Sequence, residues 1–442
     1  MTQALAVLPP VINQTTAPVP LDPLAAAGFT AIAIASAYLA FRGSPWMIGV
    51  LAFSVPFAAY RDIAHTTLTI EKSIALGTAV GLLLGGAPPW PQSPGTRRIM
   101  IASALVLAAI AASSIGASYP LHVARELFKQ AEYIVLLWCA ATFVQRIPRS
   151  AVYFTAGVAA ASVIVATLAV SQAIIGGAPS GIWINGHPLP RVAGTLEGPN
   201  QLAGFLEAVL PVLWVWPLLT AAFLPARWYA TFASSGALML SQSRAGIVVV
   251  ALAYAALWRL RRAAAALAVV PVIAGALFGL LVVAGWFVLV AHARWTDLWH
   301  MFFLDIPGQQ GGGVGTRAQL WPAALKMFAA HPLVGVGAGN FELLLPAVGL
   351  SGVQTQAASL PLQTLAEQGI IGFVALVLFA VVALRETFAL QARSPLALAA
   401  FLAVAALLVH QLVDDLFFFP KAAELCYLLV GAGSAKLADG RA

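Results

Sequence analysis

The chain contains 442 residues, of which 61% are hydrophobic and only 9% are charged. Soluble globular domains carry about 25% charged residues, so this composition excludes a soluble fold around one apolar core. Apolar runs recur from about residue 24 to residue 435, and several can cross a hydrocarbon layer of about 30 Å. Spanning segments are helices or barrel strands, and barrel strands alternate apolar with polar residues. The run 264–289 does not alternate, so the sequence predicts an all-α polytopic membrane protein.

The net charge of +7 reflects 23 basic and 16 acidic residues. In a polytopic membrane protein this excess is typical of cytoplasmic loops, so we expect membrane lipids around the chain and no nucleic-acid partner. Cys139 and Cys426 each lie inside an apolar run, which argues against a disulfide or a cysteine metal site. The first 23 residues are rich in proline and lack a basic region, so no cleaved signal peptide is predicted.

Hydropathy and helical periodicity predict a series of membrane-spanning helices along the whole chain. Thirteen segments qualify, and the number is twelve if two short ones near the N-terminus merge. The predicted spans are 24–41, 46–60, 73–87, 98–116, 131–146, 151–176, 201–221, 226–241, 245–259, 264–291, 361–389, 395–413 and 416–435.

The orientation follows from four groups of basic residues, which are separated from one another by even numbers of predicted spans. They therefore lie on one side of the membrane, and the positive-inside rule makes that side the cytoplasm. The groups lie at 97–98, 146–149, 259–262 and 385–393. The opposite side then receives 118–130, 177–200, 241–244, 292–360 and 414–421.

The longest segment between predicted spans divides the chain into three regions: transmembrane helices 1–291, a periplasmic helical loop 292–360 and C-terminal transmembrane helices 361–442. The loop contains apolar residues at helical spacing from Trp295 to Phe302. A second helix is expected at 316–329, where Pro322 is tolerated only in the first turn. The loop either lies on the membrane surface or covers a site as a lid. Long loops are often functional, and we favour the lid.

Several arginines break the positive-inside pattern because they lie on the outward side: Arg125, Arg191, Arg244, Arg294 and Arg317. Their grouping beside predicted spans indicates an anionic ligand near the outer leaflet. Arginine suits phosphate because its planar guanidinium binds in a bidentate manner and keeps its charge. The alternative is that these side chains extend to lipid headgroups, especially Arg294 and Arg125, which is close to Lys129.

Three of these arginines lie in patterned contexts. Arg191 opens the pattern Arg-x-x-Gly-x-x-x-x-Pro-Asn, in which Pro199 and Asn200 mark a helix start. Arg244 lies in the polar break Ser-Gln-Ser-Arg-Ala-Gly at 241–246. Arg317 begins an amphipathic helix, and a helix N-terminus favours an anion.

Two further motifs complete the set: Pro332-Leu333-x-Gly335-x-Gly337-x-Gly339-x-Phe341, and Leu362-x-x-Leu365-x-Glu367-x-Gly369-x-x-Gly372. Together with the arginine patterns they resemble the O-antigen ligase and O-antigen polymerase superfamily. Each motif alone is weak, but their order, spacing and common membrane side make the combination specific. The resemblance covers about residues 190–375.

The resemblance implies a membrane glycosyltransferase of GT-C-like architecture. Its donor would be an undecaprenyl-diphosphate-linked glycan, used at the periplasmic face of the bacterial inner membrane. The lipopolysaccharide O-antigen ligase, whose acceptor is the lipid A core, fits best. Nine residues separate Ser359 from Gly369, and Gly372 follows, which is the spacing of the ligase pattern. No cofactor or metal is expected, since the outward segments lack an Asp-x-Asp pair and Asp414-Asp415 are adjacent.

The implied reaction is a displacement at the anomeric carbon, in which undecaprenyl diphosphate leaves with a growing negative charge. Arg191, Arg244 and Arg317 are the candidates that stabilise this charge. Arg125, Lys129 and Asn200 are further candidates for substrate binding.

The acceptor hydroxyl needs a base, and at this point the chain departs from the family. The ligase pattern has histidine directly before the position of Ser359, and this chain has Ala358. One interpretation is a histidine-to-alanine change that leaves binding intact and impairs catalysis. The other is that a nearby group, Glu367 or His331, serves as the base. We favour an impaired form.

Other functions remain open at this stage. An O-antigen polymerase or a protein O-oligosaccharyltransferase would share the same donor chemistry. A transporter of an anionic solute would also have many helices and buried arginines, but it would show related repeats and broken helices near the midplane. No internal repeat is found, and the patterned arginines gather at one face. A purely structural scaffold would not need them.

Overall fold

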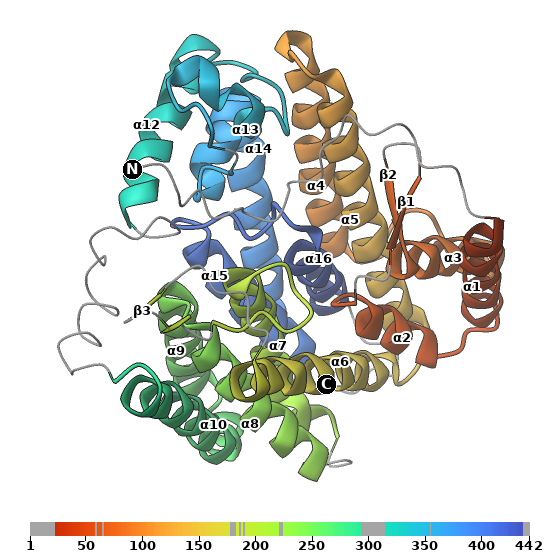
Figure 1. The fold of residues 1–442 in the computed structure, drawn as a ribbon. Coiled ribbons are helices and arrows are strands. Elements are labelled where there is room, and N and C mark those ends of the chain that lie inside the picture. The colour runs from red at the N-terminus through yellow and green to blue at the C-terminus, as the bar shows by residue number, and fades with distance from the viewer. Residues whose placement is uncertain are drawn as a thin grey trace.

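In the computed structural model, the described part of the chain is residues 23–435 without 58–59, 64–65, 177–182, 185–186, 189–190, 221–223, 293–313 and 354. This part is almost entirely helical (Figure 1), as the all-α prediction requires. Its strands form two short antiparallel hairpins. In the first, β1 (Tyr60–Ile63) pairs with β2 (Thr66–Thr69), and in the second, β3 (Trp183–Ile184) pairs with β4 (His187–Pro188).

The first half of the helices follows the predicted apolar segments. They are α1 (Pro23–Phe41), α2 (Trp46–Ser54), α3 (Ile70–Leu84), α4 (Pro94–Ala112) with the 3₁₀ turn η1 (Ser113–Gly116), α5 (Pro120–Arg146) and α6 (Ser150–Ile175). Helices α4 and α5 have proline in the first turn, where the backbone N–H that proline lacks would have no partner within the helix. Thr69 caps α3 by accepting a hydrogen bond from the Lys72 N–H at 3.1 Å.

The second half continues in the same manner. Its elements are α7 (Pro199–Leu219), α8 (Leu224–Ser241), α9 (Arg244–Leu260), α10 (Arg262–Leu289), α12 (Val314–Ala330), α13 (Phe341–Leu344), the 3₁₀ turn η2 (Leu345–Val348), α14 (Leu360–Leu390), α15 (Pro395–His410) and α16 (Pro420–Ser434). The helix predicted at 316–329 is confirmed as α12, whereas the apolar stripe from Trp295 to Phe302 and Arg294 lie outside the described residues.

Three details of the prediction are wrong. The segment 46–60 is not one helix, because α2 ends at Ser54 and a strand follows. The outward segment 118–130 is mostly helix, since α5 already begins at Pro120 and carries polar residues on an inward face. Pro322 lies in the middle of α12 rather than in its first turn, so the helix tolerates the loss of the backbone hydrogen bond that proline cannot donate.

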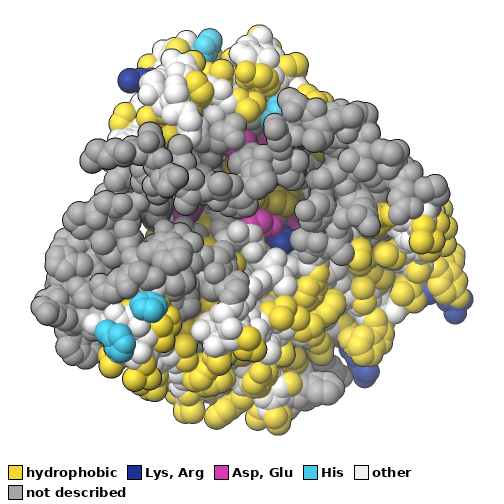
Figure 2. Space-filling model, viewed as in Figure 1, with side chains coloured by type: hydrophobic (Ala, Val, Ile, Leu, Met, Phe, Trp, Pro, Cys, Tyr) yellow, Lys and Arg dark blue, Asp and Glu magenta, His cyan; other side chains and the backbone are white. Residues whose placement is uncertain are grey.

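Seven of the described helices are long and apolar enough to cross a membrane, judged by length and composition: α1, α4 with η1, α5, α6, α7, α10 and α14. Many large apolar side chains are also exposed, and they cover much of the lower surface in the space-filling view (Figure 2). These features make the chain a multi-pass membrane protein. The predicted number of twelve or thirteen crossings and the three-part division stay predictions.

The helices pack closely through small residues, as is usual where lipid provides no hydrophobic drive for association. A Cβ on Gly431 of α16 would lie 2.2 Å from the Leu137 carbonyl oxygen of α5, and a Cβ on Gly275 of α10 would lie 2.1 Å from the Phe232 oxygen of α8. Helices α7, α15 and α16 are the most enclosed (Figure 1).

A second, smaller core lies where α12, α13 and the start of α14 meet. It contains Leu320, Ala324 and Met327 of α12 together with Phe341, Leu345 and Ala366. This core holds α12 and α13 against the first turns of α14, and Leu360 at the start of α14 bonds to the loop after α15 through the carbonyl oxygens of Gln411 and Asp414.

Candidate active site

Arg191 lies in the loop before α7 and contacts the turn between α8 and α9. Its Nε donates a hydrogen bond to the Ser241 carbonyl oxygen at 3.3 Å, and a terminal nitrogen donates to Asn200 Oδ1 at 3.3 Å. The Val192 N–H bonds to the Leu240 carbonyl oxygen at 3.3 Å. The pattern that starts at Arg191 and the pattern at 241–246 therefore meet in space.

Asp414 joins the same network from the break between α15 and α16. Asn200 Nδ2 donates to Asp414 Oδ2 at 2.6 Å, and an Arg317 nitrogen lies 3.8 Å from the same oxygen. One carboxylate thus links the start of α7, the first turns of α12 and the loop after α15.

The charges of this group are unbalanced in favour of cations. Burial lowers the pKa of Arg191. The positive charges of Arg244 and Arg317 lower it further, whereas the Asp414 carboxylate raises it. Two guanidinium groups, those of Arg244 and Arg317, thus repel the Arg191 guanidinium, and the Asp414 carboxylate attracts it. Mutual repulsion of this kind is relieved by a bound anion, and a diphosphate matches both the charge and the forked geometry of the donors.

The local sequence around Arg244 explains its position. Gln242 has a positive φ of 53°, which turns the chain sharply between α8 and α9. The Ser243 hydroxyl then caps α9 by accepting from the Gly246 N–H at 3.4 Å. A Cβ at Gly246 would lie 2.8 Å from the Ala203 Cβ, so glycine lets α9 approach α7. Arg244 itself starts α9 and is exposed.

The two glycine-containing motifs bind each other through their backbones. The N–H groups of Val336 and Gly337 donate to the carbonyl oxygens of Ala366 and Glu367 at 2.9 Å each, and the Ile370 N–H donates to the Pro332 oxygen at 2.9 Å. Helix α14 is kinked at Gly369, where φ is +63°, and this kink opens the backbone for the turn to dock.

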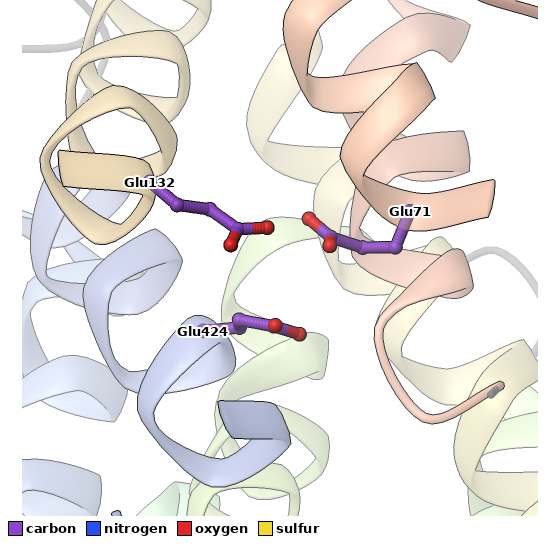
Figure 3. Close-up of side chains that lie close together, drawn as sticks. All are labelled: Glu71, Glu132 and Glu424. Carbon is purple, nitrogen blue, oxygen red and sulfur yellow. The ribbon is translucent and has the colours of Figure 1, made fainter. Parts of the chain in front are cut away.

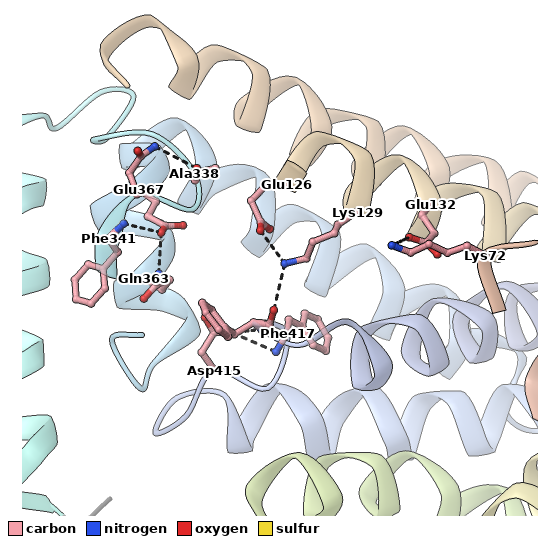
Figure 4. A network of polar contacts seen from close by, with 12 residues as sticks. Lys72, Glu126, Lys129, Glu132, Ala338, Phe341, Gln363, Glu367, Asp415 and Phe417 are labelled. Carbon is pink, nitrogen blue, oxygen red and sulfur yellow. Dashed lines mark hydrogen bonds and ion pairs between the residues drawn. The ribbon is translucent and has the colours of Figure 1, made fainter. Parts of the chain in front are cut away.

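Glu367 completes this junction. Its Oε1 accepts hydrogen bonds from the Phe341 N–H at 3.1 Å and from Gln363 Nε2 at 2.8 Å (Figure 4). Gln363 Oε1 in turn accepts from the Ala357 N–H at 2.7 Å. Glu367 therefore positions the chain just before Ala358.

Ala358 lies beside the Asp414 network. The Leu360 N–H, two residues further on, donates to the carbonyl oxygens of both Gln411 and Asp414 at 3.0 Å. Ala358 itself has φ of +50°, in the left-handed region where histidine, asparagine and aspartate are several-fold enriched among non-glycine residues. The backbone at this position thus suits the histidine of the family pattern better than alanine.

A cavity of about 110 Å³ opens next to this network, between α4, α5, α14 and the loop before α16. Its lining is mainly apolar, and its acidic and basic lining residues are Glu126, Lys129, Glu367 and Asp415. Lys129 Nζ donates to Glu126 Oε1 at 2.7 Å and to the Phe418 carbonyl oxygen at 3.2 Å (Figure 4). Burial, reinforced by the neighbouring Asp414 carboxylate, raises the pKa of Asp415 to about 7. In the space-filling view, acidic and basic side chains also gather in a central hollow (Figure 2).

A buried histidine–glutamate pair also lies near the arginines. His410 Nδ1 is 2.5 Å from Glu207 Oε1, with both side chains almost fully buried. Asp414 and Arg317 act on His410 electrostatically. Nothing in the sequence separates this histidine from an ordinary one at the end of a helix.

Four of the predicted residues, Arg191, Asn200, Arg244 and Arg317, come together in this structure. Lys129 lines the adjacent cavity, while Arg125 lies beside His122 on α5. His331 is exposed. Asp414 is not among the predicted site residues. Its only signal in the sequence is an acidic pair at a predicted outward break, and this pattern does not indicate a partner for arginine.

The fold and site define a multi-pass membrane protein with a group of arginines at one end of its helices. The sequence model of the O-antigen ligase family matches residues 229–377, about a third of the chain. The matched region includes Arg244, Arg317, Ala358 and the kink of α14. It supports membership of the chain in the O-antigen ligase and polymerase superfamily. No curated protein matches the chain.

Proposed function

We propose that the chain is an O-antigen ligase of lipopolysaccharide biosynthesis. It takes a glycan from undecaprenyl diphosphate and joins it to the lipid A core, at the periplasmic face of the bacterial inner membrane. The observation that carries this proposal is that Arg244 and Arg317 both act on Arg191 and that Arg317 pairs with Asp414, whose backbone oxygen accepts from the Leu360 N–H close to position 358.

The proposed roles follow from this geometry. The arginines bind the diphosphate of the donor and stabilise its charge as the bond to the anomeric carbon breaks. Asp414 and Asn200 hold Arg317 and Arg191 in place. The acceptor hydroxyl attacks from the side of Ala358, the position of the histidine that in the family pattern would take its proton; in this chain the proton passes to solvent water instead. No metal or cofactor takes part in this chemistry.

Ala358 makes the present chain an impaired form in this proposal. A methyl group cannot accept a proton, and the nearby Glu367 is occupied by hydrogen bonds from Phe341 and Gln363. Donor binding does not need the base, so the chain retains its lipid-linked donor while transfer is slow.

The test is transfer in vitro with three acceptors offered separately: lipid A core, a second lipid-linked glycan, and a protein. Purified chain and its Ala358→His variant are incubated with undecaprenyl-diphosphate-linked glycan. Glycan on lipid A alone supports the ligase proposal. Products on either other acceptor assign the chain to the polymerase or protein-modifying branch, and failure to retain any polyprenyl donor favours an anion transporter.

A further inference from the structure

Three glutamates from distant parts of the sequence meet away from the arginine site. Glu71 lies in the first turn of α3, Glu132 in the middle of α5 and Glu424 in the second turn of α16 (Figure 3). One carboxylate oxygen from each lies within 4.8 Å of the other two. Figure 3 shows the Glu71 and Glu132 side chains pointing toward each other.

These carboxylates are buried and incompletely bonded. Glu71 is 2% exposed and Glu424 3% exposed. Within the described residues, Oε1 of Glu71 and Oε1 of Glu132 have no hydrogen-bond partner. Buried acceptors without a partner cost free energy, and in native proteins such atoms commonly mark a bound ion or water.

Among the described side chains, the cation that contacts the cluster directly is Lys72, whose Nζ lies 3.6 Å from Glu132 Oε2. Lys129 also acts on Glu132 electrostatically, but it is bonded to Glu126 at 2.7 Å. Lys421 also acts on Glu424, but it forms an ion pair of 2.9 Å with Glu197. Close carboxylates in a desolvated place need a cation or shared protons to coexist.

A further buried polar group without a hydrogen-bond partner among the described residues lies close enough to the cluster to feel its charge. The hydroxyl of Tyr133 is buried, and it too has no hydrogen-bond partner among the described residues. Its ring contacts that of Tyr427, which is one turn after Glu424 on α16, with centroids 5.1 Å apart. Glu424 and Glu132 both act on this hydroxyl electrostatically. A water bound to an ion in the cluster would give it a partner.

We propose that Glu71, Glu132 and Glu424 bind a hard divalent cation, best matched by Ca²⁺. Two oxygens on one Ca²⁺ ion lie up to about 5 Å apart, because each Ca–O distance is about 2.3–2.6 Å. Mg²⁺ draws its ligands to about 4 Å of each other at most. Glu132 retains 13% exposure of its side chain, which offers an entry path and room for water ligands.

The ion would clamp α3 to α5 and α16. Helix α16 begins directly after the loop that contains Asp414 and Asp415, and α5 carries Lys129 less than one turn before Glu132. The cation thereby stabilises the helices that border the arginine site and takes no part in transfer. This inference is independent of the proposed function.

The test uses the full-length protein in detergent after treatment with EDTA. Calorimetric titration with Ca²⁺ is expected to show one ion bound per chain, with Mg²⁺ bound more weakly. Saturating Ca²⁺ is expected to raise the apparent Tm by about 2–4 °C. Glu71→Gln and Glu424→Gln are each expected to weaken Ca²⁺ binding at least tenfold.

The matched control is Glu386→Gln, which removes another largely buried helical carboxylate, paired with Arg98 at 2.6 Å and remote in sequence from the cluster. It is expected to leave Ca²⁺ binding unchanged. The proposal is overturned if the unaltered chain binds no Ca²⁺, or if both cluster variants bind as well as it does. Because the first criterion uses the unaltered chain, it holds even if the variants do not fold.

Discussion

At the scale of single residues, the account rests on how arginine side chains are held. Arg191 is fixed by a backbone carbonyl on one side and by Asn200 on the other, so its guanidinium is already oriented before a ligand arrives. Preorganised donors stabilise developing charge without a cost of rearrangement during the reaction. Lysine keeps the charge at such a position but loses the planar fork.

Arg191→Lys is therefore expected to weaken binding of undecaprenyl diphosphate about tenfold, or about 1.4 kcal/mol. Binding of the lipid to purified protein measures the effect. Arg393→Lys, at the predicted cytoplasmic end of α14, is the control and is expected to bind normally. Equal affinity for Arg191→Lys and the unaltered chain would remove Arg191 from the site.

The raised pKa of Asp415 is expected to make the stability of the protein depend on pH. Its folded pKa of about 7 lies above its ordinary value of 3.8, because the site is buried and Asp414 is adjacent. The folded state therefore favours the protonated acid. The contribution of Asp415 to the free energy of unfolding is complete below about pH 4 and is lost as the pH rises through 7.

Asp415→Asn is neutral at every pH and keeps an oxygen for the Phe417 and Phe418 N–H groups. The free energy of unfolding of this variant is expected to exceed that of the unaltered chain at pH 8, and to approach it near pH 4. Denaturation measured at both pH values tests this. A difference that does not change with pH would contradict the assigned pKa.

At the scale of elements, the decisive feature is the docking of the glycine turn at 335–339 on the kink of α14. Gly369 has φ of +63°, and a Cβ there would lie 2.4 Å from the Leu333 carbonyl carbon. Gly335 faces the opposite side of the same junction, where a Cβ would lie 2.2 Å from the Glu367 carbonyl carbon. Backbone atoms cannot move away from such contacts, so both positions require glycine.

Gly369→Ala is expected to destabilise the protein by roughly 3 kcal/mol or more and to detach the segment 314–358 from α14. The apparent Tm and the yield of folded protein in detergent measure this. The control is Gly285→Ala in α10, where a Cβ meets open space and alanine favours the helix. If both variants melt alike, the junction does not need a left-handed residue.

At the scale of the whole molecule, the arginine group is built from segments predicted to face outward, whereas Glu132 and Glu424 of the glutamate cluster lie inside the predicted spans 131–146 and 416–435. The described surface is rich in exposed apolar side chains. The orientation predicts which loops a membrane-impermeant reagent can reach.

Single cysteines at Ser351 and Ala392 test this orientation, because both positions are exposed and the native Cys139 and Cys426 are buried. In intact cells, Ser351→Cys is expected to react with an impermeant maleimide, and Ala392→Cys only after the membrane is opened. The reverse pattern would place the arginine site in the cytoplasm.

Much of this architecture could be predicted because it depends on local sequence. Apolar runs located the helices, and Pro199 and Asn200 marked the start of α7 that the structure has. The arginines were found because they violate a charge rule. Asp414, Glu207 and the glutamate cluster could not be found, since their meaning arises from contacts between helices distant in sequence. The inward face of α5 was missed because its polar residues have the composition of a loop.

The most direct test of the central claim compares the chain with its Ala358→His variant in transfer of an undecaprenyl-diphosphate-linked glycan to the lipid A core. The left-handed backbone at 358 accommodates histidine, and the arginines are already in place beside it. The account predicts that the variant transfers glycan at least about a hundredfold faster, since general bases contribute about 10²–10⁴-fold. Equal rates for the two chains, fast or absent, would contradict the assignment of position 358 as the missing base.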